Sequence, residues 1–172
     1  MKKMINVFDY AGDICKAMSP GVLLTAKHNG KVNPMTIGWG TIGVEWGKAL
    51  FIAFVRPSRF THHMIDKTGE FTVNVPVGSA GKILGYCGTK SGAEVDKIAD
   101  LGLTLEEPVA ISVPGIKELP LTLECRVLYK QDQVLDWIPD DLRDRYYPDR
   151  EDKNDYHTAY YAEIVSAYII ED

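Results

Sequence analysis

Alternating and continuous apolar stretches along the chain predict a protein built mainly from β-strands. Apolar and polar side chains alternate over residues 121–129, and residues 160–170 give a second such segment, so both read as half-buried strands. Residues 49–55 form a continuous apolar run, which is typical of a strand that is covered on both sides or closed into a barrel. Residues 21–25 are apolar, and Asn29-Gly30 supplies the two positive-φ positions of a tight hairpin turn.

The remaining pattern favours an antiparallel β-barrel. Helical spacing is confined to short segments at 58–67, 80–86 and 94–101, and no GxGxxG loop opens a long helix. Many strands with short helices between them favour a barrel over a doubly wound parallel sheet. In the strand predicted at 71–75, Thr72 and Asn74 share one face, so Asn74 is expected to point away from the core side.

One segment interrupts the strand pattern. Residues 136–155 contain two prolines and dense mixed charge. A surface excursion or lid and a solvated loop without a role are equally good interpretations of this segment.

Composition narrows the class of protein. With 172 residues, 45% of them apolar, the chain suits one domain spanning residues 1–172. A net charge of -5 gives no general attraction to nucleic acid or to an anionic membrane. No stretch reaches the roughly 18 apolar residues of a membrane span, and the first residues lack an apolar signal core, so a cytoplasmic protein is expected. Three cysteines without a CxxC pair argue against a disulfide framework and a zinc site, and no metal is expected.

Residues 56–61 (RPSRFT) form a candidate anion site. They follow a predicted strand, and Ser58 is suited to cap a short helix whose first N–H groups lack internal partners. Arg56, Arg59 and Thr61 could add charge-assisted hydrogen bonds to a phosphate. The plain alternative is a capped helix with two ordinary surface arginines.

Residues 33–40 (NPMTIGWG) form a second candidate site on a predicted barrel strand. Gly38 and Gly40 flank Trp39 and thin the wall where a planar ring could approach the backbone. Asn33 or Thr36 could hydrogen-bond the rim of such a ring while Met35 or Trp39 packs on it. The alternative is a core or interface tryptophan beside glycines that mark a bulge.

The order of these segments resembles the flavin reductase-like family with the FMN-binding split barrel, and its flavoredoxin-like branch in particular. The resemblance is carried by NPMTIGWG, VRPSRFT, FTVNVP and SGAEVDK and runs from about residue 20 to residue 130, resuming in the final strand. It implies a split β-barrel of Greek-key antiparallel strands that binds FMN. It places the isoalloxazine and ribityl chain along residues 33–39, the phosphate at residues 56–61, and further contacts near the flavin at Asn74, Ser91, Gly92, Asp96 and Lys97. The cofactor-binding residues implied are Asn33, Met35, Thr36, Ile37, Gly38, Trp39, Arg56, Ser58, Arg59, Thr61, Asn74, Ser91 and Lys97.

Several residues keep two interpretations. Ile98 stands where the family often has phenylalanine, so the chain departs from the family pattern at that position. His157 either reaches the flavin or is an ordinary strand-end histidine, and Lys97 is either a flavin partner or a solvent-facing lysine. Cys87 is either a reactive thiol near the cofactor or a buried apolar residue, whereas the strand position of Cys125 predicts packing.

The resemblance also implies an activity. We expect electrons to pass from NAD(P)H through FMN to free flavin, ferric iron or a partner protein in a homodimer, with the flavin near the subunit interface and no acid-base triad. Another hypothesis is a non-enzymatic FMN electron-transfer protein that a partner protein reduces. A third is a cofactor-free barrel that binds nucleic acid, for which Arg126, Tyr129 and Lys130 give a weak signal.

Overall fold

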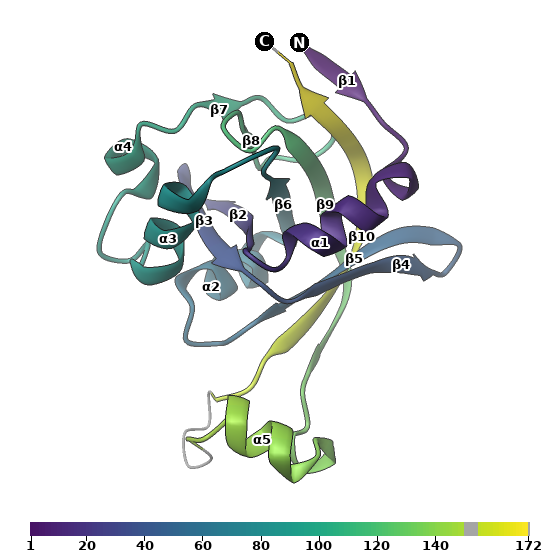
Figure 1. Ribbon diagram of the computed structural model, residues 1–172, viewed down its shortest axis with the longest axis vertical. Helices are drawn as coiled ribbons and strands as arrows, with labels where there is room; N and C mark the ends of the chain where they lie inside the picture. The colour runs from purple at the N-terminus through teal and green to yellow at the C-terminus, as the bar shows by residue number, and fades with distance from the viewer. Residues whose placement is uncertain (150–154, 172) are drawn as a thin grey trace.

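An eight-stranded antiparallel sheet dominates the structure, a computed structural model that describes residues 1–149 and 155–171 (Figure 1). Seven of its strands follow the order β3-β2-β6-β9-β10-β5-β4, and β1 pairs with β10. No pairing between β3 and β4 closes the sheet within the described residues, so it is a split barrel. The strands are β1 (Lys2–Met4), β2 (Val22–His28), β3 (Lys31–Ile37), β4 (Gly40–Glu45), β5 (Lys48–Val55), β6 (Glu70–Val75), β9 (Leu121–Asp132) and β10 (Thr158–Ile170), with β7 (Leu105–Glu106) and β8 (Gly115–Ile116) forming a separate pair.

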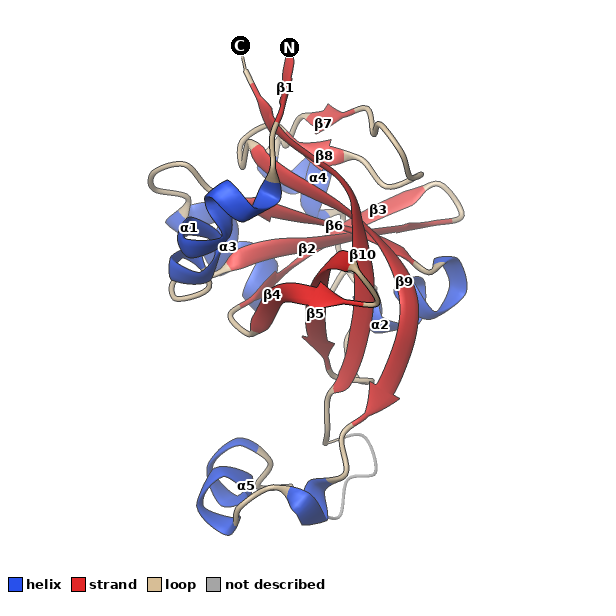
Figure 2. Cartoon of the chain, turned by 90° about the vertical axis from the view of Figure 1, so that its right-hand side faces the viewer, coloured by secondary structure: helices blue, strands red, loops and turns tan. Residues whose placement is uncertain are grey.

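Short helices surround this sheet, as the sequence predicts (Figure 2). They are η1 (Val7–Tyr10), α1 (Ala11–Ala17), α2 (Phe60–Thr68), α3 (Gly81–Thr89), α4 (Lys97–Leu101), η2 (Leu135–Trp137) and α5 (Asp140–Tyr146). The mainly β fold class and the antiparallel split barrel are therefore confirmed. Because β6 lies between β2 and β9 and not beside β5, the chain crosses over in the manner of a Greek key.

The hairpin predicted at Asn29-Gly30 is confirmed. These residues have φ angles of 49° and 78° and join β2 to β3 in register. A second hairpin of the same kind joins β4 to β5 through Trp46 and Gly47, with φ angles of 52° and 69°. The sequence pattern does not reveal it, because tryptophan is not a usual residue for the left-handed region.

The core lies inside the barrel, and the apolar strand β5 supplies much of it. Leu50, Phe51, Ala53 and Val55 are buried, which agrees with the covered strand predicted at 49–55. Strand β10 pairs with β9 along most of its length, and on its other edge with β5 over residues 158–163 and with β1 over residues 168–170. These pairings fix the ends of β9 and β10 below the barrel, where the next segment begins (Figure 1).

Residues 136–149 and 155, the described part of the segment that interrupts the strand pattern, contain α5 and project beyond the ends of β9 and β10 (Figures 1 and 2). We call this part the excursion. Residues 150–154 of the predicted segment lie outside the described residues. The excursion is anchored at its C-terminal end, where Tyr147 is only 4% exposed and its hydroxyl donates a hydrogen bond to Gln133, so this end is not a freely solvated loop. Most of the other described residues of the excursion are exposed.

Three local predictions need correction. The helix predicted from Ser58 begins at Phe60, and its N-cap is Arg59 without a side-chain cap, so Ser58 does not cap it. The segment 33–40 does not form one strand, because β3 ends at Ile37 and β4 begins at Gly40. The helix predicted at 94–101 is shorter, because the side chain of Asp96 accepts hydrogen bonds from the N–H groups of Ile98 and Ala99 and starts α4 at Lys97.

Candidate functional site

Two adjoining cavities lie where β3, α2 and α3 meet. The α2 cavity has a volume of about 160 Å³ and the β3 cavity a volume of about 210 Å³. They share Met35, Thr36 and Arg59, so together they form one continuous trough. The α2 cavity is lined by Asn33, Met35, Thr36, Ser58, Arg59, Phe60, Thr61, Cys87, Gly88, Thr89, Lys90, Ser91, Gly92 and Lys97. The β3 cavity is lined by Met35, Thr36, Ile37, Gly38, Trp39, Phe54, Arg56, Arg59 and His157.

This trough gathers all the sequence-predicted cofactor residues except Asn74. The sequence reasoning missed Phe54 and Phe60. Phe54 is half-buried on the face of β5 opposite to Ala53 and Val55. In a continuous apolar run this face carries no polar residue, so no pattern in the sequence separates Phe54 from the core.

The N-terminus of α2 opens into the α2 cavity. Ser58, Arg59, Phe60 and Thr61 line the cavity, and no side chain caps the first turn of the helix. Unpaired N–H groups at such an end favour an anion. The guanidinium of Arg59 makes no hydrogen bond or ion pair with any residue of the described chain, so it is available to a ligand in either cavity.

Arg56 is engaged by the excursion instead. Its guanidinium pairs with the carboxylate of Asp155, donates a hydrogen bond of 2.6 Å to the carbonyl oxygen of Tyr146, and lies 5.0 Å from the ring centroid of Tyr147. The excursion is thus attached to the rim of the β3 cavity. Arg56 and Arg59 look equivalent in the sequence, but Arg56 is bound to the excursion, whereas the guanidinium of Arg59 is available to a ligand.

Asn33 and Gly92 make a close contact at the far end of the α2 cavity. The Asn33 amide, 2% exposed, donates a hydrogen bond of 2.8 Å to the hydroxyl of Thr61. A Cβ atom on Gly92 would lie 1.9 Å from Oδ1 of Asn33. Glycine at position 92 is therefore required for the loop after α3 to close over β3.

Lys97 is buried beneath this loop and is not the solvent-facing helix lysine of the alternative interpretation. Its ammonium donates hydrogen bonds of 2.9 Å and 3.0 Å to the carbonyl oxygens of Pro34 and Cys87. Burial lowers the pKa of Lys97, and the positive charge of Arg59 lowers it further. Lys97 thus links β3 to α3 and places a cationic group at the wall of the α2 cavity.

Cys87 borders the α2 cavity but is 1% exposed. Burial raises the pKa of its thiol to about 11, and the nearby Lys97 offsets this only in part. A thiol in that state is almost wholly protonated at neutral pH, so the structure favours the interpretation of Cys87 as a buried apolar residue. Cys125 is fully buried, which confirms the prediction that it packs in the core.

Trp39 and His157 form the wall of the β3 cavity on the side of the excursion. Their ring centroids are 5.1 Å apart, and Nδ1 of His157 lies 2.8 Å from the hydroxyl of Tyr147. Burial, together with Arg56 and Arg59, lowers the pKa of His157 to about 4. The imidazole is therefore neutral at physiological pH, and it lines the β3 cavity just before β10 begins.

Thr36 uses its hydroxyl inside the protein, where it donates a hydrogen bond of 2.6 Å to the carbonyl oxygen of Leu84. Its hydroxyl oxygen can still accept a hydrogen bond from a ligand in the trough.

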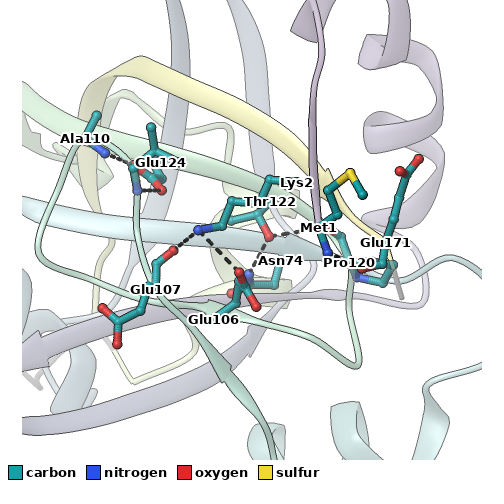
Figure 3. Close-up of polar contacts among 11 residues, drawn as sticks. Met1, Lys2, Asn74, Glu106, Glu107, Ala110, Pro120, Thr122, Glu124 and Glu171 are labelled. Carbon is teal, nitrogen blue, oxygen red and sulfur yellow. Dashed lines mark hydrogen bonds and ion pairs between the residues drawn. The ribbon is translucent and has the colours of Figure 1, made fainter.

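Asn74 lies in a different polar cluster (Figure 3). Its Oδ1 accepts a hydrogen bond of 3.0 Å from Thr25, and its amide donates one of 3.2 Å to Thr122. The side chain points away from the apolar face of β6, as predicted, but it is fully buried and lines neither cavity. We call Thr25, Thr72, Asn74 and Thr122 the Asn74 cluster.

Other candidate sites find little support in the described residues. Arg126 and Lys130 lie within ion-pair distance of Glu70 and Asp66, at 3.7 Å and 2.8 Å, so neither presents an unpaired charge to a nucleic acid. Over residues 1–149 and 155–171, no group of three His, Cys, Asp or Glu side chains is placed to hold a metal ion. Among the helices of the same residues, none has the length and apolarity needed to cross a membrane.

Comparisons with known proteins find relatives of part of this chain. An uncharacterized protein of Archaeoglobus fulgidus is 40% identical over 98 residues, which are 57% of this chain and 55% of that protein. Another match, to an uncharacterized protein of Pyrococcus abyssi, covers 62% of that protein, so the aligned part of the chain spans less than two thirds of either relative.

Solved structures with the same fold include flavin proteins. Flavoredoxin of Methanosarcina acetivorans has a TM-score of 0.68 and 28% identity, with 88% of this chain and 68% of that chain covered. An NADH:FAD oxidoreductase of Streptomyces globisporus has a TM-score of 0.66 and 15% identity over 87% of this chain and 74% of that chain, a likeness of fold alone. The family model described as the flavin reductase like domain matches residues 16–172. With that match over most of its length, the chain belongs to the flavin reductase-like family.

Proposed function

We propose that this protein binds FMN along the trough and passes electrons from NAD(P)H through FMN to an acceptor. The observation that carries the proposal is the guanidinium of Arg59, which has no protein partner in the described chain and lies at the uncapped N-terminus of α2, in the wall of both cavities. A phosphate ester in the α2 cavity would supply the anion that this end of the trough attracts.

The residues of the trough fit the two ends of FMN. Ser58, Arg59 and Thr61 can hold the phosphate in the polar α2 cavity. The β3 cavity offers a flatter wall, in which Gly38 lacks a side chain and Trp39 and Phe54 supply aromatic surface for the isoalloxazine ring. Ser91 and Lys97 close the trough near the loop after α3.

FMN, when bound, supplies the electron transfer, so the chain needs no acid-base triad. The protein groups orient the ring and screen it from water. The ammonium of Lys97 can offset negative charge at the polar edge of the cofactor, and the neutral His157 adds no charge beside Trp39. Free flavin, ferric iron and a partner protein are the acceptor classes that we propose.

Absorbance spectroscopy tests the proposal directly. The purified protein, mixed with FMN and separated from excess, should retain a flavin band near equimolar amount and should oxidise NADH or NADPH. A colourless protein that ignores added FMN would contradict both parts of the proposal.

A second candidate function is a non-enzymatic FMN electron carrier that a partner protein reduces. The likeness to the flavoredoxin of Methanosarcina acetivorans, at 28% identity, favours it. Stopped-flow mixing of the FMN-loaded protein with each nicotinamide separates the two functions. Rapid bleaching of the flavin supports the reductase, and an unchanged flavin that a reduced ferredoxin bleaches supports the carrier.

We further propose one domain over residues 1–172, a homodimer and a cytoplasmic location. The edge strand β4 supports a second copy, because Val44 on the strand and Trp46 in the turn that follows it are 68% and 56% exposed. The free thiols of Cys15, Cys87 and Cys125 suit a reducing compartment. Light scattering of the purified protein measures the oligomeric state.

A further inference from the structure

A third cavity, of about 460 Å³, lies between the excursion and the barrel. We call it the excursion cavity. It shares Gly38, Trp39 and Phe54 with the β3 cavity, so it continues the trough beyond the end assigned to the flavin ring. Its outer wall comes from Ile138, Leu142 and Tyr146 of the excursion.

The chemistry of the excursion cavity differs from that of the trough. None of its described lining residues carries a charge, whereas Arg59 and Lys97 line the α2 cavity. Its amide and hydroxyl side chains, Gln133, Tyr146 and Tyr147, are all uncharged, and the hydroxyl of Tyr147 donates a hydrogen bond of 2.8 Å to Oε1 of Gln133. A charged ligand would lose its hydration there without gaining an oppositely charged partner. A flat, neutral ring would instead bury apolar surface against Phe54, Leu142 and Trp39.

The outer wall is held in place by contacts with the barrel. The rings of Trp39 and Tyr146 meet edge to face with centroids 5.1 Å apart, and Arg56 bonds to the carbonyl oxygen of Tyr146. These contacts place the excursion cavity beside the wall assigned to the isoalloxazine ring. A compound in this cavity would therefore lie next to the redox centre of the proposed function.

We propose that the excursion cavity binds a neutral, planar conjugated carbonyl compound of the quinone class, which serves as the electron acceptor. The identification as an acceptor rests on the proposed function, whereas binding itself does not. The overall reaction balances as NAD(P)H, one proton and the quinone giving NAD(P)⁺ and the hydroquinone. The two electrons come from the nicotinamide cofactor, and the protons come from that cofactor and from water.

Duroquinone is a suitable probe because its ring is fully substituted and does not add to thiols. Its affinity is measured by calorimetry with the full chain, both free of FMN and loaded with it. The test variant is Leu142→Asp, which places a charge in the cavity wall. The matched control is Leu128→Asp, because Leu128 and Leu142 are both 43% exposed and Leu128 lines none of the three cavities.

We expect Leu142→Asp to weaken duroquinone binding at least tenfold and Leu128→Asp to change it less than twofold. Both variants should keep the FMN affinity and the melting temperature of the wild type. They should also reduce ferricyanide at the wild-type rate, because this small trianion does not bind in an apolar cavity. Equal duroquinone affinity in all three proteins would overturn the proposal. The proposal would also be overturned if light scattering gave a lower molecular mass for Leu142→Asp than for the wild type. That result would mean that Leu142 lies in an interface between two copies of the chain.

The two proposals can fail separately. If FMN does not bind but duroquinone binds the wild type and not Leu142→Asp, the proposed function is wrong and the binding site stands. If FMN binds and NAD(P)H reduces it while duroquinone shows no binding, the proposed function stands and the inference about the excursion cavity is wrong.

Discussion

Two buried asparagines on neighbouring parts of the sheet have opposite roles. Asn33 donates one hydrogen bond, to Thr61, and lies at the wall of the α2 cavity. Asn74 bonds to Thr25 and Thr122 and lines neither cavity of the trough. Both residues match positions that the family resemblance places near the flavin, and both are almost fully buried.

The difference lies in where the polar atoms are used. The Asn74 cluster satisfies its amide and hydroxyl groups internally, so it holds β2, β6 and β9 together. The residues around Asn33 leave polar atoms and a cationic side chain, Arg59, at the edge of a cavity. A ligand site is therefore marked by polar groups that remain available, and burial of a polar residue is not enough to identify one.

The largest effect that separates the two regions is expected from Asn74→Ala. The change leaves buried hydroxyl groups without their partner, which costs about 3 kcal/mol of unfolding free energy. Urea denaturation of the FMN-free protein measures this loss, and the FMN dissociation constant of the folded variant should change less than twofold. The matched variant Asn33→Ala should show the reverse, with weaker FMN binding by about tenfold, or about 1.4 kcal/mol. If Asn74→Ala alone abolished FMN binding in a folded protein, the assignment of the two asparagines would be wrong.

The two regions also differ in how pH affects their contribution to the unfolding free energy, and the expected difference is of similar size. The Asn74 cluster contains no group that titrates near neutrality, whereas His157 at the trough has a pKa lowered from 6.5 to about 4. Between these values the unfolded chain binds the proton more readily than the folded chain. The contribution of His157 to stability is therefore complete above pH 6.5 and is lost as the pH falls toward 4, by about 3 kcal/mol.

Urea denaturation of wild type and His157→Gln at several pH values between 4 and 7 checks this. The difference in unfolding free energy between the two proteins should shrink as the pH falls, because only the wild type loses the His157 contribution. A constant difference would show that His157 does not titrate with a lowered pKa.

Much of the fold could be predicted from the sequence because period-two patterns and turn residues act locally. The hairpin at Asn29-Gly30 and the alternation in β9 depend on neighbours along the chain, and the structure contains both. The trough was also predictable in part, because residues 33–39 and 56–61 each gather several of its groups in one segment. Only the family resemblance assigned Ser91 and Lys97 to the site, because no local pattern in the sequence connects these residues to β3.

The features that could not be predicted from the sequence depend on contacts between residues far apart in the chain. Nothing near Arg56 in the sequence indicates that Asp155 and Tyr146 engage it, so the two arginines of the RPSR segment looked alike. The excursion was ambiguous for the same reason, since its packing depends on a ring contact between Tyr146 and Trp39. The resemblance places Asn74 near the flavin, whereas its hydrogen bonds to Thr25 and Thr122 come from strands far apart in the sequence, so no local pattern reveals them.

A smaller effect distinguishes the arginines themselves. Arg59→Ala should raise the FMN dissociation constant by about 30-fold, or about 2 kcal/mol, because it removes a charge-assisted contact to the phosphate. Arg56→Ala should raise it about threefold, because the guanidinium of Arg56 is already engaged by Asp155 and Tyr146. Flavin fluorescence titration gives both values. Riboflavin, which lacks the phosphate, is the matched ligand, and a 30-fold effect of Arg59→Ala on riboflavin would place Arg59 at the ring and not at the phosphate.

The smallest expected effect concerns the two buried cysteines. Cys87 lines the α2 cavity and Cys125 lies in β9, and burial raises the pKa of both thiols. A thiol reagent at pH 7.5 should therefore label Cys15, which is exposed, long before the other two.

Raising the pH by one unit should speed labelling of Cys87 about tenfold, because the thiolate fraction grows tenfold well below a pKa of about 11. FMN should slow the labelling of Cys87, because it fills the cavity beside this residue, and should leave the labelling of Cys125 unchanged. Mass spectrometry of the digested protein measures the labelling of each cysteine. Equal protection of both cysteines by FMN would show that the cofactor stabilises the whole fold and does not occupy the α2 cavity in particular.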